Sequence, residues 1–412
     1  MNFKHLATLA VASLSLAAAA DVMDRPQGIK IGERMTLKPY VGLSYTYDSN
    51  VNSTKHRRGS SIWRVNPNLD LTYLGDNWSL VGSVWYKYNA YSYTPSKYNS
   101  SSYGERLKFD WADSKADEAG WRVLLTEKFE KISQDDSIGY GNNGRGVGRD
   151  RKEFTGDGLV ERRLNQYWHV ATLANYYLLD YENGASYQTL YGWKRAVVGG
   201  EIGYAPTKWT DFIVHANYQW YWQDNSGSGV LNQIGNKSRG YSLMGGIATH
   251  ATEKITYRLL GGWSRFDYGR SHKIDGMTYQ ASANWQATQT LHFMALATSY
   301  YQPSEYQLGT ATRVDSASVG MGKSLVRGKV NATADIAYRR EQREYSFNNA
   351  AGDYNQQYWT GRLGVNYTLN RFVTLFSNLE YQTCMAHGRN APAAHYGNYN
   401  RFRFTVGLRL TY

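Results

Sequence analysis

Residues 61–74 read SIWRVNPNLDLTYL and alternate between apolar and polar side chains. Trp63 and Val65 share one parity, whereas Arg64 and Asp70 share the other. Successive side chains of a β-strand point to opposite faces, so the stretch predicts a strand with one apolar and one wet face. The apolar face points at a core in a soluble sandwich and at lipid in a membrane barrel. The alternation alone is compatible with a sandwich and with a barrel, so the choice between them depends on the other segments of the chain.

The length of the alternating segments favours the barrel. From Met35 onward each segment runs for about 11–15 residues, whereas strands of soluble proteins average about five or six and a tilted bilayer-crossing strand needs about 9–11. In residues 277–287 the apolar parity also places alanines between aromatic residues, which is unusual for a packed sandwich core. We expect about eighteen strands, near residues 36–48, 61–74, 78–91, 100–111, 121–132, 152–164, 167–181, 189–204, 210–223, 240–251, 255–268, 277–287, 290–302, 311–324, 328–344, 356–369, 371–384 and 397–412.

The connections between these segments differ in length from one end of the strands to the other. Short ones such as GDN (75–77) and NR (370–371) contrast with long polar ones at 133–151, 224–239 and 385–396. Outer-membrane barrels have short periplasmic turns and longer extracellular loops, and an even strand count returns both ends to the periplasm. The predicted fold class is therefore all-β, a transmembrane antiparallel β-barrel of about 18 strands without a plug domain.

The N-terminus reads as an export signal. Lys4 precedes an apolar run that ends in small residues, with Ala18 and Ala20 placed for cleavage before Asp21. We expect a signal peptide at residues 1–20, a short periplasmic segment at 21–34 and an outer-membrane β-barrel at 35–412. The expected segment before the barrel is too short for a plug domain.

The composition agrees with a barrel and disfavours other classes. Mean hydropathy is −0.59, which excludes a helical membrane protein, and 36 Tyr and 13 Trp suit the two membrane–water interfaces. The single cysteine, Cys384, excludes an internal disulfide.

The polar positions of the alternating segments, which are expected to face the lumen, predict a lumen with excess positive charge. Acidic members include Asp70, Asp110, Glu130, Glu201, Asp335 and Glu380, which basic members outnumber by about two to one. Such a lumen favours anions, although ion-pair ladders that simply fill the barrel remain an alternative for any single residue. The candidate pore-lining basic residues are Arg64, Lys87, Arg106, Lys108, Arg122, Arg195, Arg258, Lys329, Arg339, Arg362, Arg401, Arg403 and Arg409.

No pattern in the chain points to an enzyme. His215, His250 and His292 occur singly, and neither a metal-ligand spacing nor a nucleophile elbow is found. We predict no catalytic residues, no metal, no cofactor and no nucleic-acid partner.

The last expected strand ends in a pattern typical of barrel insertion. Its apolar parity finishes on an aromatic residue, which resembles the C-terminal signal that outer-membrane barrels present to the assembly machinery, although Phe is the usual last residue. The candidate insertion signal is Phe402, Phe404, Val406, Leu408, Leu410 and Tyr412.

The first expected strand resembles the opening of the putative beta-barrel porin type 2 family. Residues 37–51, LKPYVGLSYTYDSNV, contain Gly42 and alternating tyrosines, followed by Asp48, Ser49 and Asn50. The resemblance implies an outer-membrane pore, with several relatives associated with exopolysaccharide or capsule export, and it offers no catalytic residues.

Three functions remain open at this point. The first is a porin-like channel with modest anion preference, the second an exporter of an acidic exopolysaccharide or capsule, and the third a structural or adhesion barrel with an occluded lumen. The expected location is the outer membrane of a Gram-negative bacterium. The expected partners are outer-membrane lipid and lipopolysaccharide, the barrel-assembly machinery, and an anionic solute or polysaccharide.

Overall fold

The computed structural model describes residues 28–51, 57–93, 95, 99–113, 119–133, 150–181, 192–207, 209–223, 237–252, 254–268, 272–303, 311–326, 329–344, 354–387 and 398–412. Within these ranges the chain forms nineteen strands and all eighteen predicted segments are found, with ends shifted by a few residues. The strands are β1 (Ile29–Ile31), β2 (Met35–Asp48), β3 (Ser60–Leu74), β4 (Trp78–Tyr91), β5 (Ser100–Ala112), β6 (Trp121–Ile132), β7 (Arg151–Arg163), β8 (Trp168–Tyr181), β9 (Trp193–Thr207), β10 (Thr210–Gln223), β11 (Lys237–Thr252), β12 (Ile255–Tyr268), β13 (His272–Gln286), β14 (Leu291–Pro303), β15 (Ala311–Leu325), β16 (Val330–Glu344), β17 (Tyr354–Thr368), β18 (Val373–His387) and β19 (Tyr399–Thr411).

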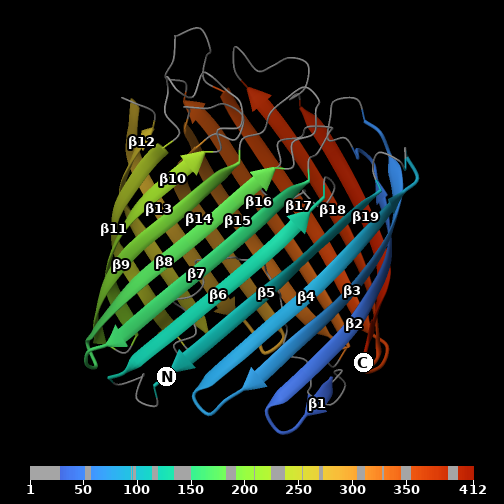
Figure 1. The fold of residues 1–412 in the computed structure, drawn as a ribbon, viewed down its shortest axis with the longest axis horizontal. Helices are drawn as coiled ribbons and strands as arrows, with labels where there is room; N and C mark the ends of the chain where they lie inside the picture. The colour runs from blue at the N-terminus through green and yellow to red at the C-terminus, as the bar shows by residue number, and fades with distance from the viewer. Residues whose placement is uncertain are drawn as a thin grey trace.

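The strands β2 to β19 close into a barrel. Each pairs antiparallel with its neighbours in the chain, and β19 returns to pair with β2, where Phe404 lies opposite Tyr47 and Leu408 opposite Leu43. Figure 1 shows the tilted strands wrapping around a central space. The prediction of an all-β, antiparallel barrel of eighteen strands is therefore confirmed.

The additional strand, β1, extends the edge of β2 beyond the end of β19. Ile29 lies opposite Leu37, whereas β19 pairs with β2 only from Tyr40 onward. The turn between β1 and β2 contains Gly32, whose φ of +65° is one that residues with a side chain rarely adopt. The segment 21–34, which was expected to carry no strand, thus contributes one. Residues 1–27, including the predicted signal peptide, lie outside the described residues, and the absence of a plug domain stays a prediction.

The short turns gather at one rim of the barrel, here called the turn rim, where asparagine side chains fix two of them. Asn165 Oδ1 accepts hydrogen bonds from the amides of Tyr167 and Trp168 at 2.8 and 3.0 Å. In the same way, Asn370 Oδ1 accepts hydrogen bonds from the amides of Phe372 and Val373 at 2.8 and 3.0 Å. Most residues of the predicted long loops lie outside the described part, but β11 begins at Lys237 and β18 continues to His387, inside ranges expected to be loop.

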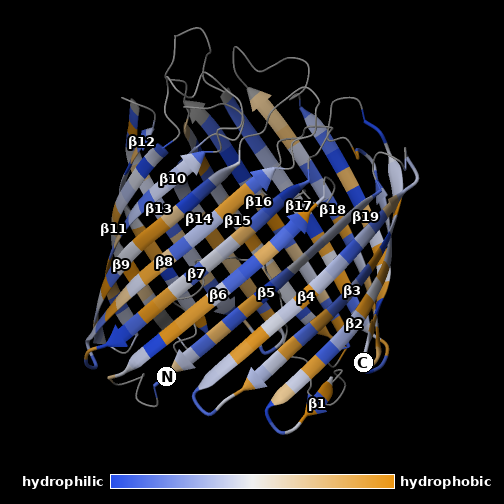
Figure 2. Ribbon diagram, in the orientation of Figure 1, coloured by the Kyte–Doolittle hydropathy of each residue, from blue (hydrophilic) through white to orange (hydrophobic). Residues whose placement is uncertain are grey.

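Side chains alternate between the outer and inner faces as the sequence predicted. Trp63 is 64% exposed on the outer face of β3, whereas its neighbour Ile62 is completely buried on the inner face. Residues directly opposite each other in the sheet share a face, so the register carries this assignment around the barrel. Alternating hydrophobic and hydrophilic colours run along the strands in Figure 2.

Aromatic pairs form two bands on the outer face. Near the turn rim, Trp168 contacts Tyr204 with ring centroids 4.8 Å apart, and similar pairs lie beside other short turns. Farther up the wall, Tyr338 and Trp359 lie 4.7 Å apart. Two such girdles are typical of transmembrane barrels. Among the described residues no helix has the length and apolar character needed to cross a membrane.

Candidate functional site: the barrel lumen

The register places the predicted basic residues on the inner face. Arg64 lies opposite Ser44, Lys87 opposite Ser102 and Arg362 opposite Glu380, each pair on the inward parity. The other candidates within strands share this parity, whereas Lys329 lies in the turn before β16. Their contribution to conduction stays a prediction.

One part of the inner wall is a ladder of ion pairs. Arg362 on β17 lies 3.6 Å from Asp335 on β16 and 3.0 Å from Glu380 on β18. Glu380 in turn lies 3.6 Å from Arg403 on β19. The alternative that some arginines are held in ladders therefore describes this part of the wall.

The ladder reaches the junction between the last and first barrel strands through Asp48 on β2. Arg401 Nε donates to both oxygens of Asp48 at 3.0 Å, and Arg403 lies 3.7 Å from the same carboxylate. The sequence showed no acid between Arg401, Arg403 and Arg409, but parity within one strand cannot reveal acids on adjacent strands. Arg409 lies over the ring of Tyr40, with its guanidinium carbon 5.1 Å from the ring centroid.

Other inward acids that the sequence reading overlooked lie beside bases. Arg339 Nε donates to Glu341 Oε1 at 2.8 Å, and Arg151 pairs with Glu153. Because these partners are two residues apart, they share the inner face of one strand. The inward charged residues missed from sequence include the acids Asp48, Glu153, Asp157, Glu161 and Glu341 and the bases Lys38, Lys128, Arg151 and Arg163. The excess of basic groups is therefore smaller than the predicted ratio of two to one.

The inner wall from β5 to β14 borders a cavity of about 590 Å³. Its inward side chains are largely hydroxyls and amides, such as Thr126, Asn175 and Gln280. Four of the lining inward side chains are basic and one is acidic: Arg106, Lys108, Lys128 and Arg195 against Asp157.

Asp157, the one acid among the described residues whose inward side chain borders the cavity, is held by neutral donors. Asn175 Nδ2 donates to Asp157 Oδ1 at 2.7 Å, and Thr126 Oγ1 donates to Oδ2 at 3.2 Å. Arg195 donates to Asn175 Oδ1 at 2.7 Å rather than to a carboxylate. Arg106 forms no ion pair with any residue in the described part of the chain. Lys108 and Lys128, by contrast, lie 3.8 Å from Asp110 and 2.6 Å from Glu130 on the same inner face. The uncompensated positive charge of this wall therefore comes from Arg106 and Arg195.

A line of polar side chains follows the inner face of β10. Gln219 Nε2 donates to Asn217 Oδ1 at 3.1 Å, and the Tyr221 hydroxyl lies 2.7 Å from Gln219 Oε1. Asn217 Nδ2 lies 3.4 Å from His215 Nε2, and His215 Nδ1 lies 3.3 Å from Glu201. His215 is thus a hydrogen-bonded lumen residue, as the sequence reading favoured. His292 also has inward parity, and the side chain of His250 lies outside the described residues.

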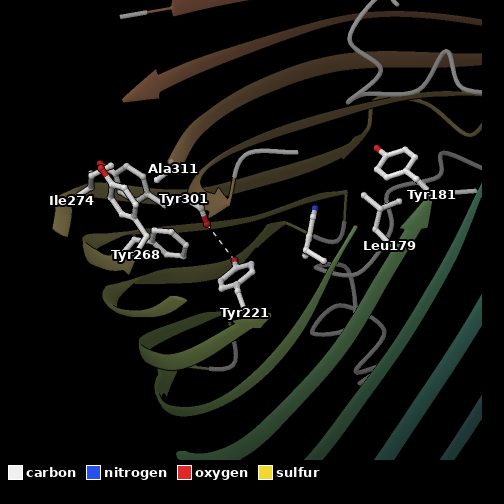
Figure 3. Packing of buried hydrophobic residues seen from close by; sticks show 9 residues of the cluster. Leu179, Tyr181, Tyr221, Tyr268, Ile274, Tyr301 and Ala311 are labelled. Atoms are coloured by element: carbon white, nitrogen blue, oxygen red, sulfur yellow. Dashed lines mark hydrogen bonds between the residues drawn. The ribbon is translucent and has the colours of Figure 1, made fainter. Parts of the chain in front are cut away.

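An aromatic cluster on the inner wall was not predicted. Tyr221 contacts Trp193 and Phe266, with ring centroids 5.7 and 5.3 Å apart. Figure 3 shows Tyr301 and Ala311 packed beside these strands, with the Tyr221 hydroxyl 3.2 Å from the Tyr301 carbonyl oxygen. One feature of the sequence could have indicated this cluster. The inward-facing positions are polar along most of each strand and become aromatic at the strand ends that lie away from the turn rim.

A family model matches the C-terminal part of the chain. Residues 229–412 match the model of the family described as putative beta-barrel porin 2. This confirms the resemblance. The match to the porin 2 family lies in the C-terminal part of the chain, whereas the motif that suggested it lies in β2. The porin 2 match and the closed barrel together point to the outer membrane of a Gram-negative bacterium.

Several solved structures are similar to the chain. The siderophore receptor PirA from Pseudomonas aeruginosa is 8% identical with a TM-score of 0.40, covering 93% of this chain and 81% of PirA. The FrpB iron transporter from Neisseria meningitidis is 8% identical with a TM-score of 0.43, covering 93% and 82%. The loop L8 deletion mutant of OmpT from Vibrio cholerae is 11% identical with a TM-score of 0.36, covering 92% and 100%. No curated protein matches the chain.

Proposed function

We propose that the protein is an outer-membrane channel through which small solutes pass passively, with a modest preference for anions. The observation that carries this proposal is the cavity along β5–β14, where Arg106 and Arg195 point inward without a carboxylate partner among the described residues. Barrels of 16–18 strands are wide enough to leave an aqueous channel. The proposal includes no catalytic step.

The preference is expected to be modest because the two parts of the inner wall differ in charge. On β16–β19 the arginines are neutralised by Asp335, Glu380 and Asp48. On β5–β9, Arg106 and Arg195 lack a carboxylate partner among the described residues. Uncompensated positive charge lowers the barrier for anions and raises it for cations, while salt in a wide pore screens the effect.

Reversal potentials in planar bilayers test this function. Under a KCl gradient, the wild-type protein should give stepwise currents with a reversal potential on the anion-selective side. The double substitution Arg106→Gln/Arg195→Gln should move the potential toward cation selectivity. Arg162→Gln is the matched control, because Arg162 lies on the outer face over the ring of Trp121, does not border the cavity and should leave the potential unchanged. Absence of stepwise conductance, or cation selectivity of the wild-type channel, would contradict the proposal.

A second candidate function is export of an acidic polysaccharide. Its support is that the bases line one continuous wall together with hydroxyl and amide groups, a surface suited to an extended polyanion with hydroxyls. Deleting the gene and measuring surface polysaccharide tests it. An unchanged amount of polysaccharide would count against export and leave the passive channel. The liposome-swelling assay tests the third function, a structural or adhesion barrel with an occluded lumen. If the lumen is occluded, small sugars will not enter liposomes that contain the protein, and the liposomes will not swell.

A further inference from the structure

The hydrogen-bond ladder between β13 and β14 stops partway up the barrel wall. It runs up from the turn rim and ends where Tyr279 lies opposite Ser299. Beyond that pair, residues 272–278 of β13 and 300–303 of β14, all in the described part of the chain, are not paired with each other. Each stretch stays paired with its other neighbour, β12 or β15. The two strands therefore separate in the half of the wall away from the turn rim, and this place is here called the seam.

Side-chain hydrogen bonds replace the backbone ladder at the seam. Thr278 Oγ1 donates to the carbonyl oxygen of Ser299 at 2.6 Å, at the point where the strands part. The next carbonyl on this edge of β14 is that of Tyr301. It accepts a hydrogen bond from the Tyr221 hydroxyl of β10 at 3.2 Å instead of one from an amide of β13.

The Tyr301 side chain fills the space between the separated strands. Its register with Arg313 places it on the outward parity of β14, yet it is only 7% exposed. It packs in the aromatic cluster with Ile274 of β13, and a Cβ added at Gly276 would lie 2.7 Å from its hydroxyl oxygen. Ile274 and Gly276 have the inward parity of β13. The inner side of β13 therefore covers the outer side of β14 here, with Tyr301 between them (Figure 3).

A wall closed in this way can open while its ladders stay intact. In hydrocarbon, unpaired backbone groups are tolerated only where protein covers them, so the packing over the seam is what keeps it shut. Met277 is 67% exposed beside the seam and lies opposite Trp263 on the outer face, so the seam reaches the apolar belt. Moving Tyr301 and breaking two side-chain hydrogen bonds is enough to part the strands, whereas any complete ladder would lose a row of backbone hydrogen bonds.

The lumen cavity borders the seam from the inside and is amphipathic. Thr278, Ser299 and Tyr301 line it together with Arg106 and Arg195. Guanidinium groups form strong hydrogen bonds with carboxylates, and apolar side chains favour contact with an alkyl chain. The half-buried apolar side chains of the lining that point inward include Leu173, Val197 and Leu296.

We propose that the cavity binds alkyl chains that end in a carboxylate, and that these molecules pass between the lumen and the outer leaflet through the seam. The carboxylate meets Arg106 or Arg195, and the chain lies along the apolar inward side chains toward Thr278. Displacement of Tyr301 lets the chain slide between β13 and β14 into lipid. The inference rests on the proposed function for its cavity and its orientation in the membrane, but it requires no ion current along the barrel axis.

A photoreactive probe in the membrane tests both parts of the proposal. Dodecanoate with a diazirine at the end of its chain is added to vesicles that contain the full-length protein. Light converts the diazirine, with loss of nitrogen, into a carbene that inserts into neighbouring C–H, N–H or O–H bonds, and mass spectrometry of peptides locates the label. We expect label on Leu173, Leu296 and Thr278 in addition to the lipid-facing wall. The same chain ending in trimethylammonium is the control probe and should label the lipid-facing wall alone.

A substitution at the seam separates the lateral route from entry along the barrel axis. Tyr301→Ala removes the ring that fills the seam and should raise the rate of lumen labelling by about tenfold, because truncating a buried aromatic side chain destabilises the closed arrangement. The rate is measured by varying the delay between addition of the probe and irradiation. Tyr358→Ala is the matched control and should leave the rate unchanged, because Tyr358 is buried on the inner face of β17, which is paired with both neighbours along its length.

Two further variants keep the test decisive if Tyr301→Ala does not assemble. Thr278→Val keeps the branched shape of the side chain but loses the hydrogen bond to Ser299, so it should also raise the rate. Arg106→Gln/Arg195→Gln should lower lumen labelling by about tenfold, because the carboxylate loses its charge-assisted hydrogen bonds.

The outcomes distinguish the lateral route from the passive channel. Label confined to the lipid-facing wall, or equal rates for the wild type and the seam variants, overturns the proposal. Lumen label without stepwise conductance contradicts only the passive channel, and anion-selective conductance without lumen label contradicts only the lateral route.

Discussion

Asp48 on β2 and Arg401 on β19 form a bidentate ion pair that joins the first and last strands of the barrel. The Asp48 side chain is completely buried. Its Oδ1 also accepts a hydrogen bond from the amide of Asn50 at 2.9 Å, and Asn50 Nδ2 donates to the carbonyl of Asn400 at 3.0 Å. The Tyr-Asp-Ser-Asn stretch of the first strand therefore holds the junction where the chain closes on itself.

Replacing Asp48 should weaken that junction. Asp48→Asn leaves Arg401 as a buried charge with an incomplete partner, and removing one member of a buried pair typically costs about 3–5 kcal/mol. Urea unfolding of the detergent-solubilised barrel, followed by tryptophan fluorescence, measures the loss. Arg34→Gln, which breaks the exposed pair with Asp76, should cost only about 0–1 kcal/mol. Equal losses for the two variants would show that closure does not depend on the buried pair.

Tryptophans on the two faces should respond differently to lipid. Trp63 is exposed on the outer wall, whereas Trp193 is buried in the inner aromatic cluster. In vesicles of brominated lipid, Trp63→Phe should reduce the quenched part of the fluorescence, and Trp193→Phe should reduce only the unquenched part. The reverse result would invert the assignment of faces on which the barrel orientation depends.

Thiol labelling should report the lumen. Cys384 is 1% exposed, and Gln356 Nε2 donates to its Sγ at 3.2 Å, so the native protein should resist water-soluble thiol reagents and react after unfolding. In a Cys384→Ser background, Asn217→Cys should react rapidly from water, because Asn217 borders the cavity. Val214→Cys, on the outer face, should stay unlabelled in vesicles. Labelling of both new cysteines would mean that the outer face is wet.

The inner aromatic cluster should contribute to stability and to pore size. Phe266 is 2% exposed, and its replacement by alanine should cost about 3–5 kcal/mol, as for buried Phe in other proteins. The same change should raise single-channel conductance if the cluster narrows the path. Phe212→Ala, on the outer face and 53% exposed, is the control and should leave conductance unaltered. Conductance unaffected by Phe266→Ala would place the cluster away from the ion path.

We propose that the outward residues of β19 form the signal for assembly. Phe402, Val406 and Leu410 face outward beside β2 and β18, and Tyr412 ends the row. Tyr412→Ser should lower the amount of assembled barrel in the outer membrane, whereas Tyr412→Phe should maintain or raise it. Heat-modifiable mobility in gel electrophoresis measures assembly in cells. Normal assembly of Tyr412→Ser would remove the terminal aromatic residue from the signal.

The barrel could be predicted because its strands are long enough for the alternation to repeat many times. β1 escaped detection, since three residues, Ile29–Ile31, are too few to show a period. β13 was predicted from residue 277, although it begins at His272, because the inward parity there carries Ile274 and the outward parity Asp275. The pattern is thus reversed where the strand extends past the apolar belt.

The inward position of most candidate bases followed from parity, but their partners did not. Arg401 meets Asp48, which is 353 residues away in the sequence, and only the closure of the barrel brings them together. Aromatic residues on the inner face, such as Trp85 and Tyr221, were missed because aromatic side chains were expected on the lipid face. Parity gives the face of a residue, whereas pairing depends on the register between strands.

The continuation of the β19 edge by β1 has a consequence for protein engineering. The amide of Tyr412 donates to the carbonyl of Pro39 at 3.1 Å, and β1 begins a few residues away along the same edge, at the turn rim. A short linker from Tyr412 to Ile29 would therefore need to span only this gap, and a break opened at the hairpin of residues 75–77 would lie on the same rim. A circular permutant of this kind would keep every strand pairing while moving the chain break away from the Asp48–Arg401 junction.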